Sequence, residues 1–269
     1  MTVAAASGVA TFADLSIDKA GTGFKLSAGG PGIVTPVASD QFNIVYAGLV
    51  GWWAAEGNAD DIVYGNNGTV QGGVTFTAGK VGQAFSFNGV DDGVLIGANA
   101  NLDIGSGDGL TIDAWIFPKG AGTGAAFGGS GPIVEYKNGV HFWQLESGDP
   151  LTGLFVNLID TNSVNHTLEV PAGVTQNEWN HVAVTYSKTT GVVTLYRNGS
   201  AVGSQDLGVF TPRTTTDLYL GRRPPDSFSV SGGASFNGLL DEVDIFDRAL
   251  TGDEILAIYN AGINGKPTP

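Results

Sequence analysis

Cysteine is absent from the 269-residue sequence, which excludes disulfide bonds and any chemistry that needs a thiol. The absence assigns no compartment, because exported proteins can fold without disulfides. Familiar catalytic motifs are missing as well: there is no G-x-S-x-G nucleophile turn, no H-E-x-x-H metal motif and no glycine-rich phosphate loop followed by a helix. These gaps favour a protein that binds or supports over one that catalyses.

Positive charge is also scarce. Lysine and arginine number 12 against 26 aspartate and glutamate residues, which gives a formal net charge of −14. Nucleic acids and anionic membrane surfaces would be repelled, so neither is expected as a partner. The same excess of carboxylates is compatible with Ca²⁺, a hard cation that prefers oxygen ligands.

Long apolar runs are missing too. No stretch approaches the roughly 18 apolar residues that span a bilayer, so we expect no membrane insertion. The opening MTVAAASGVA has neither the basic start nor the long apolar stretch of a signal peptide. If the protein is exported, we expect the export signal to lie outside this chain.

Glycine is abundant instead, with 42 residues that act mainly as turn residues. The clearest pattern covers residues 177–203. Residues 179–186 alternate with a period of two, residues 187–191 end in glycine, and Asn198-Gly199 closes the return strand. The pattern predicts a β-hairpin.

This hairpin resembles the W-x-H-V-A-x-T-Y…Y-x-N-G signature of the laminin-G-like jelly rolls in the concanavalin A-like lectin/glucanase superfamily. The matching residues are Trp179, His181, Val182, Ala183, Thr185, Tyr186, Tyr196, Asn198 and Gly199. Residues 79–97, residues 111–117 and the ending G-L-L-D-E-V…R-A-L-T-x-x-E-I-x-x-x-Y are similar to other parts of the family pattern, so the resemblance covers about residues 48–262. It implies an all-β fold: a two-sheet antiparallel jelly-roll sandwich with one short C-terminal helix.

The sequence therefore divides into residues 1–46, a jelly roll at residues 47–263 and a tail at residues 264–269. Strands are predicted at 8–12, 15–17, 23–28 and 41–44, and residues 18–26 resemble part of a bacterial immunoglobulin-like (Ig-like) repeat. Because an Ig-like sandwich needs roughly 100 residues, residues 1–46 are interpreted as a partial Ig-like segment or as a linker. At the other end, Thr251 and Glu254 predict a capping box for a helix that ends at Gly262.

Carboxylates near the end of the chain leave a catalytic alternative open. Glu242, Asp244 and Asp247 resemble the E-x-D-x-x-E motif of laminarinase-type glycoside hydrolases, whose two catalytic carboxyls lie about 5–5.5 Å apart for retention. Two departures count against catalysis: the third carboxylate is an aspartate, and the motif falls on the last strand instead of mid-chain. The laminin-G-like ending D-E-V-x-I explains the same residues without catalysis. His181, in the hairpin signature, is expected to be a hydrogen-bonded structural residue.

The resemblance also implies a structural Ca²⁺ site where the loop after the first strand meets the last strand. The implied ligands are Glu56, Asn58 and Asp61 in the early loop and Asp241 in the last strand. A site there would join the two ends of the domain, because the first and last strands of a jelly roll lie side by side. The alternative is a solvated acidic loop whose aspartates bind backbone amides.

A carbohydrate site would combine an aromatic ring with planar polar groups. Four of the 5 tryptophans fall in signature strands and are expected to pack in the core, whereas Trp143 lies outside them beside a polar loop. We predict that it lines a concave face or its rim together with Tyr136, His141, Gln144, Asn157, Arg222 and Arg223. The arginine pair could bind an anionic sugar or a partner carboxylate; the alternative is a surface pair that only improves solubility.

Taken together, the sequence predicts a non-catalytic, extracellular or cell-surface module of a larger bacterial protein, stabilised by Ca²⁺ and tethered to other domains. Its partner would be a polysaccharide, an oligosaccharide or a surface glycoconjugate, bound for recognition or adhesion. The alternatives are a structural spacer in a surface protein, and a glycoside hydrolase that uses Glu242 and Asp244. Fold alone does not decide among them, because one fold supports many functions.

Overall fold

The computed structural model describes residues 21–30, 37–44, 46–122, 129–146, 152–225 and 233–262. These residues fall into two units, one before Gly48 and one from Gly48 onward. In the first unit, two strand pairs are antiparallel: β1 (Gly21–Phe24) with β4 (Phe42–Ile44), and β2 (Ser27–Ala28) with β3 (Val37–Ala38). The predicted strands at 8–12 and 15–17 lie outside the described residues. The Ig-like repeat therefore stays a prediction.

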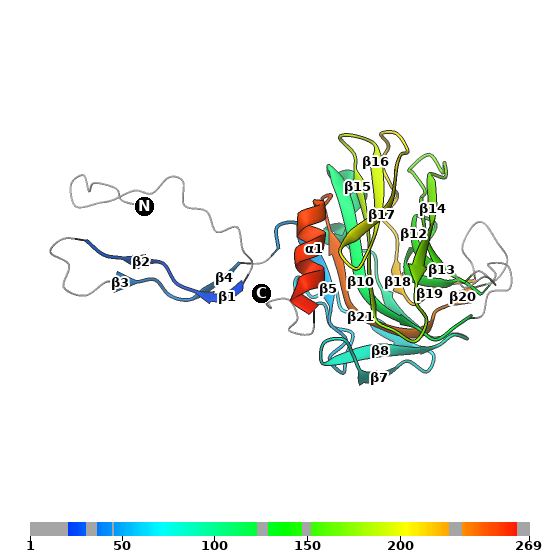
Figure 1. Cartoon of the computed structure of the whole chain (residues 1–269), viewed down its shortest axis with the longest axis horizontal. Helices are drawn as coiled ribbons and strands as arrows, with labels where there is room; N and C mark the ends of the chain where they lie inside the picture. Colours follow the sequence, from blue (N-terminus) through cyan, green and yellow to red (C-terminus); the bar gives the residue numbers. More distant parts are fainter. Residues whose placement is uncertain are drawn as a thin grey trace. The chain divides into compact units, whose positions relative to one another are not determined.

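The second unit is a sandwich of two antiparallel sheets (Figure 1). The order of neighbours in the eight-stranded sheet is β17 (Ser200–Asp206), β16 (Val192–Arg197), β15 (Asn180–Ser187), β10 (Gly109–Pro118), β21 (Asn237–Phe246), β8 (Gln83–Asn88) and β7 (Thr75–Ala78), and β5 (Leu49–Trp53) also pairs with β21. In the seven-stranded sheet the order is β14 (Thr167–Val174), β13 (Thr152–Leu158), β12 (Val140–Leu145), β11 (Gly131–Tyr136), β18 (Leu218–Leu220), β9 (Gly93–Ile96) and β6 (Thr69–Gln71). The predicted two-sheet jelly-roll sandwich is confirmed.

Smaller elements complete the unit. A two-stranded ribbon pairs β19 (Arg222–Arg223) with β20 (Ala234–Ser235), and two short 3₁₀ turns, η1 (Ala100–Leu102) and η2 (Ile104–Ser106), precede β10. In the described part of the chain, no helix has the length and apolar character needed to cross a bilayer.

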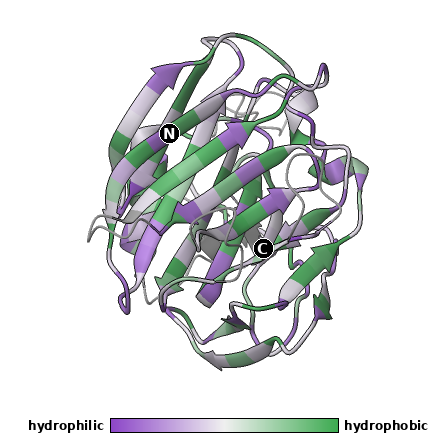
Figure 2. Cartoon of the chain, turned by 90° about the vertical axis from the view of Figure 1, so that its right-hand side faces the viewer, coloured by the Kyte–Doolittle hydropathy of each residue, from purple (hydrophilic) through white to green (hydrophobic). Residues whose placement is uncertain are grey.

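The hydrophobic core fills the space between the two sheets. On β10, Ile112, Ala114 and Ile116 belong to this core, and the residues between them face the other side of the sheet. The hydropathy colouring of Figure 2 follows this alternation of hydrophilic and hydrophobic residues along the strands. Burial of these apolar side chains is the main stabilising contribution, at roughly 25 cal/mol per Å² removed from water.

The predicted hairpin is present as β15 and β16, with Tyr186 opposite Val193. Its turn ends at Gly191, which has a φ of 75°. The next turn, Asn198-Gly199, has φ values of 49° and 77°, and two consecutive positive values are the mark of a tight type I′ hairpin turn. Here glycine and asparagine are needed for the conformation itself.

The two ends of the sandwich meet, as predicted, because β5 pairs antiparallel with β21. After β21 the chain forms α1 (Gly252–Ala261), which lies on the face of the eight-stranded sheet turned away from the seven-stranded sheet (Figure 1). There the ring of Tyr259 stacks on Trp115 at a centroid distance of 5.6 Å. The capping box of Thr251 and Glu254 is present and Gly262 caps the C-terminus of the helix, so both predictions are confirmed.

Candidate functional site

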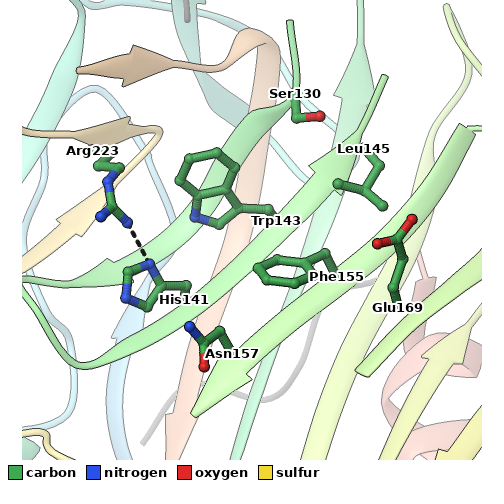
Figure 3. A pocket seen from close by; sticks show the side chains of 8 residues that line it. All are labelled: Ser130, His141, Trp143, Leu145, Phe155, Asn157, Glu169 and Arg223. Atoms are coloured by element: carbon green, nitrogen blue, oxygen red, sulfur yellow. Dashed lines mark hydrogen bonds between the residues drawn. The ribbon is translucent and has the colours of Figure 1, made fainter. Parts of the chain in front are cut away.

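A pocket of about 250 Å³ opens on the face of the seven-stranded sheet that is turned away from the core (Figure 3). Its volume is slightly below the 300–1,000 Å³ range of pockets that hold a drug-sized ligand. The lining combines apolar, polar and charged side chains: Trp143, Leu145, Phe155, Ser130, His141, Asn157, Glu169 and Arg223.

Strand alternation places most of these side chains. On β12, Val140 and Phe142 belong to the core, so His141 and Trp143 point to the opposite face. The same rule on β13 sends Phe155 outward beside them, since Trp143 and Phe155 are cross-strand partners. In the same way, Asn157 is paired with His141, and Glu169 on β14 is paired with Phe155. Arg223 comes from the β19–β20 ribbon.

A buried carboxylate, Glu135 on β11, organises one side of the pocket. It is 0% exposed, and its Oε1 accepts a hydrogen bond from Arg223 Nη1 at 2.8 Å. Its Oε2 accepts from Trp143 Nε1, also at 2.8 Å. Glu135 thereby fixes both the guanidinium and the indole ring, and the guanidinium carbon lies 5.8 Å from the centre of that ring.

His141 completes this network. Its Nδ1 lies 2.5 Å from Arg223 Nη1, drawn as the dashed line in Figure 3, and 3.1 Å from Glu135 Oε2. Arginine can only donate, so its contact is a hydrogen bond when Nδ1 carries a lone pair, whereas the contact with Glu135 is one when Nδ1 carries a proton. Nε2 is buried and has no hydrogen-bond partner within the described ranges.

The aromatic surface that a ligand can reach belongs to Phe155. Trp143 is only 3% exposed, with its N–H bound to Glu135, whereas Phe155 is half-buried. An exposed ring can stack against the apolar face of a sugar, and a fully covered ring cannot. Trp143 therefore supports the pocket, and Phe155 is the accessible ring.

Four of the seven predicted ligand residues line this pocket: Trp143, His141, Asn157 and Arg223. The other three, Tyr136, Gln144 and Arg222, do not. Sequence reasoning missed Ser130, Leu145, Phe155 and Glu169, and it also missed the supporting carboxylate of Glu135. Alternation counted outward from Trp143 on β12 and from its partner on β13 would have indicated Leu145 and Phe155.

Tyr136 and Gln144 were predicted as ligand residues, but the structure buries both of them outside the pocket lining. Tyr136 is a core residue whose hydroxyl donates to the carbonyl of Leu102 at 3.0 Å, and burial raises its pKa above the ordinary range. Gln144 is buried on the core-facing side of β12, where its Nε2 donates to the carbonyl of Leu145. In both cases a side chain next in sequence to an outward residue faces inward.

Arg222 and Arg223 point to different environments, although they are adjacent. Arg223 is buried against Glu135, while Arg222 is half-buried and its Nη1 reaches Gln71 at 3.5 Å. The aliphatic part of Arg222 packs over Gly93. The predicted arginine pair is therefore not a single cationic surface.

The predicted calcium ligands are already occupied by protein donors. Asp61 Oδ1 accepts from the backbone N–H groups of Trp52 and Val63, and its Oδ2 accepts from those of Tyr64 and Asn66 and from the side-chain amide of Asn66. Asn58 Oδ1 accepts from the N–H of Asp60. These contacts match the backbone-binding alternative for the acidic loop.

The last-strand carboxylate and Glu56 bind a different turn, at residues 79–83. Asp241 Oδ2 accepts from the N–H groups of Lys80 and Val81, at 2.7 and 2.9 Å. Glu56 accepts from the N–H of Gln83. Among the residues that the structure describes, no group of three or more Asp, Glu or His side chains is arranged to hold a metal ion. The donor set therefore does not fit a calcium site.

The catalytic alternative lacks access to a substrate. Glu242 is 3% exposed and Asp244 is 0% exposed, and neither lines the pocket. Glu242 has a positive φ of 52° where the β10–β21 register shifts, so it and Asp244 do not follow simple alternation. On the neighbouring strands, His181 Nε2 lies 3.2 Å from Asp113 Oδ1 in a fully buried pair, which confirms its predicted structural role.

Comparison with known proteins identifies the family. A family model described as the concanavalin A-like lectin/glucanases superfamily, of the laminin-G-like type, matches residues 88–256. The chain belongs to this laminin-G-like family. The match confirms the resemblance found in the hairpin and in the terminal strand and helix. No curated protein matches the chain.

Solved structures share the laminin-G-like fold. Domain 4 of AbnA, a GH43 extracellular arabinanase from Geobacillus stearothermophilus in complex with arabinotriose, has a TM-score of 0.56 and 18% identity, covering 78% of this chain and 98% of that one. The binding domain of Paraclostridial Mosquitocidal Protein 1 has a TM-score of 0.60 and 17% identity, covering 80% and 52%. The receptor binding domain of botulinum neurotoxin C/D mosaic serotype has a TM-score of 0.58 and 16% identity, covering 80% and 51%. This chain thus spans about half of the two toxin domains, and at such identities the likeness concerns the fold.

Proposed function

We propose that this laminin-G-like chain is a non-catalytic carbohydrate-binding module that acts outside the cell, and that the pocket beside β12 and β13 is its ligand site. The observation that carries the proposal is the composition of that pocket. It offers a reachable phenyl ring in Phe155 next to hydroxyl, amide, imidazole and carboxylate groups. Carbohydrates require this combination, because a sugar ring has apolar C–H faces and a hydroxyl-bearing edge.

The fixed geometry of the pocket supports binding. Glu135 holds Arg223 and Trp143 through hydrogen bonds of 2.8 Å, so these side chains are ordered before a ligand arrives. A prearranged site avoids part of the entropic cost of binding, which would otherwise reduce the affinity for a small, well-hydrated ligand.

Proteins of similar structure support the same proposal. One protein of similar structure is a domain of an extracellular arabinanase that was solved with arabinotriose, and others are the binding domains of toxins. An attachment to further domains, in a larger bacterial protein, is part of the proposal. A role in adhesion would use the same pocket, with the glycan on a neighbouring surface.

The alternatives are less well supported. A pure spacer has no use for an ordered polar pocket, and a hydrolase would need its carboxylates to reach a substrate, which the burial of Glu242 and Asp244 opposes. Calcium stabilisation belonged to the sequence-based prediction, but the carboxylates concerned bind backbone amides, so calcium has no part in the proposed binding.

A glycan panel tests the proposal. The whole chain, incubated with neutral and acidic polysaccharides and oligosaccharides, is expected to bind at least one class with and without EDTA. Absence of binding to every glycan of the panel would contradict the proposal and favour a spacer. Incubation with each bound glycan is expected to release no reducing ends. Release that disappears in Glu242→Gln, but not in the exposed control Glu178→Gln, would instead establish a hydrolase.

A further inference from the structure

We infer that the pocket selects uncharged sugars and rejects anionic ones; this inference rests on the proposed function and names its ligand class. The sequence alone suggested the reverse, since Arg222 and Arg223 are prominent in a chain with so few cations. The structure gives the two arginines environments that leave neither of them to neutralise an anionic sugar.

The first step concerns the positive charge. Arg223 is the one cationic residue among the described residues that line the pocket, and Arg222 lies outside it. Nη1 of Arg223 carries two hydrogens; one is directed at Glu135 Oε1 at 2.8 Å and the other at His141 Nδ1 at 2.5 Å. The guanidinium is therefore paired with a carboxylate of the protein, and because Arg223 is only 3% exposed, little of it can be reached by a sugar carboxylate or sulfate.

The second step is the balance of charge around the pocket. Glu135 offsets the charge of Arg223, and Arg223 Nη1 also lies within hydrogen-bond distance of His141 Nδ1. Glu169, exposed on β14 at the edge of the pocket, adds an uncompensated negative charge to this set. The chain as a whole carries a formal net charge of −14. A uronate, sialate or sulfate group would enter a negative site on a negative protein.

The third step is what remains for recognition. The Glu169 carboxylate accepts hydrogen bonds from sugar hydroxyls, and Ser130 Oγ, which accepts from the N–H of Glu146 at 3.2 Å, can donate its own proton. His141 Nε2 is buried and has no hydrogen-bond partner in the described part of the protein, so a ligand hydroxyl that reaches it gains a hydrogen bond with either tautomer of the ring. Hydroxyl groups satisfy acceptors and donors alike, whereas an anionic group satisfies donors only.

The test compares ligands that differ in charge but share a backbone. Polygalacturonate and its fully methyl-esterified form are one such pair, and sulfated and desulfated glycans supply further pairs on an array. Wild type is expected to bind the uncharged member of at least one pair at least tenfold more tightly. The difference should shrink as salt rises, because screening weakens the repulsion. Glu169→Gln is expected to reduce the discrimination several-fold, and the matched control Glu178→Gln, exposed but outside the pocket, is expected to leave it unchanged.

The possible outcomes separate the two proposals. Anionic glycans bound as tightly as their uncharged counterparts, or more tightly, would overturn the inference while leaving a carbohydrate-binding module. Discrimination that Glu169→Gln does not alter would also overturn it, because the charge would then not be the cause. Absence of binding to any glycan would contradict both the inference and the proposed function.

Discussion

Arg223 and Glu135 form a buried ion pair, with Nη1 and Oε1 separated by 2.8 Å, at the edge of the candidate ligand pocket. The pair joins the β19–β20 ribbon to β11 of the seven-stranded sheet. Because both groups are removed from water, each depends on the other to compensate its lost hydration. The pair thus links the ribbon to the sheet. It also explains why Arg223, the only cationic residue in the described lining, is directed toward the protein and not toward a ligand.

Removal of one partner is expected to be costly. Arg223→Met leaves the Glu135 carboxylate buried without its cation, so we expect the free energy of unfolding to fall by about 3–5 kcal/mol. The double variant Glu135→Gln/Arg223→Met should recover a substantial part of the loss, since no uncompensated charge remains. Urea denaturation of both variants measures this. The matched control is Arg222→Met, which we expect to remain within about 0.5 kcal/mol of wild type; an equal loss in the control would refute the assignment.

The accessible phenyl ring is expected to carry much of the ligand affinity. Phe155→Ala removes the apolar face offered to a sugar ring. We therefore expect the dissociation constant to increase about tenfold, which is equivalent to a loss of about 1.4 kcal/mol in binding free energy. Isothermal titration with the glycan found on the panel measures it. Tyr64→Ala, which removes an exposed aromatic side chain outside the pocket, serves as the control and should bind as wild type does.

The contribution of Glu254 at the start of α1 to the stability of the fold is expected to decrease at low pH. The hydrogen bonds from Arg248 lower the pKa of Glu254 from its ordinary value of 4.5 to about 2. A carboxyl whose folded-state pKa is lowered contributes stability above the unfolded value and loses it as the pH falls through the folded value. The thermal midpoint of wild type should therefore exceed that of Glu254→Gln by a constant amount above about pH 4.5, and the gap should close toward about pH 2. A gap that widens in acid would contradict the assignment.

The early acidic loop is expected to be stable without metal. Asp61→Ala would leave several buried or half-buried N–H groups without an acceptor, so we expect a loss of about 3 kcal/mol or more in urea denaturation. Addition of Ca²⁺ or EDTA to wild type is expected to leave its thermal midpoint unchanged. A metal that binds only the folded state raises the midpoint, so a Ca²⁺-dependent rise in wild type that is absent in Asp61→Ala would establish the metal site after all.

Local sequence patterns predicted the turns and the helix well, because each of these patterns requires a particular backbone conformation. The turn at Asn198-Gly199 needs two consecutive positive φ angles, and Thr251 with Glu254 closes a capping box over one helical turn. The pairing of β5 with β21 came from the resemblance to the laminin-G-like family. No local pattern relates strands so far apart in sequence.

The site was predicted only in part, because it depends on which face each side chain occupies and on partners from distant strands. His141 and Trp143 were identified because they lie close together in one unusual segment. Gln144 follows Trp143 directly, and strand alternation turns its side chain to the core side of β12. The register shift on β11, between Pro132 and Val134, further disturbs simple counting near Glu135. That Arg223 would find Glu135 rather than a ligand could not be read from either residue alone.

The antiparallel pairing of the first and last strands has a mechanical consequence. Leu49, at the start of β5, lies opposite Phe246, at the end of β21. A force that pulls on the two ends of the sandwich would first detach α1. It would then load the strand pair at one end, so that the backbone hydrogen bonds break one after another. Tension is resisted far better when many such bonds are sheared together, so single-molecule stretching should open this domain at low force. Low mechanical resistance of this kind would be consistent with the proposed ligand-binding role and would argue against a link that carries tension.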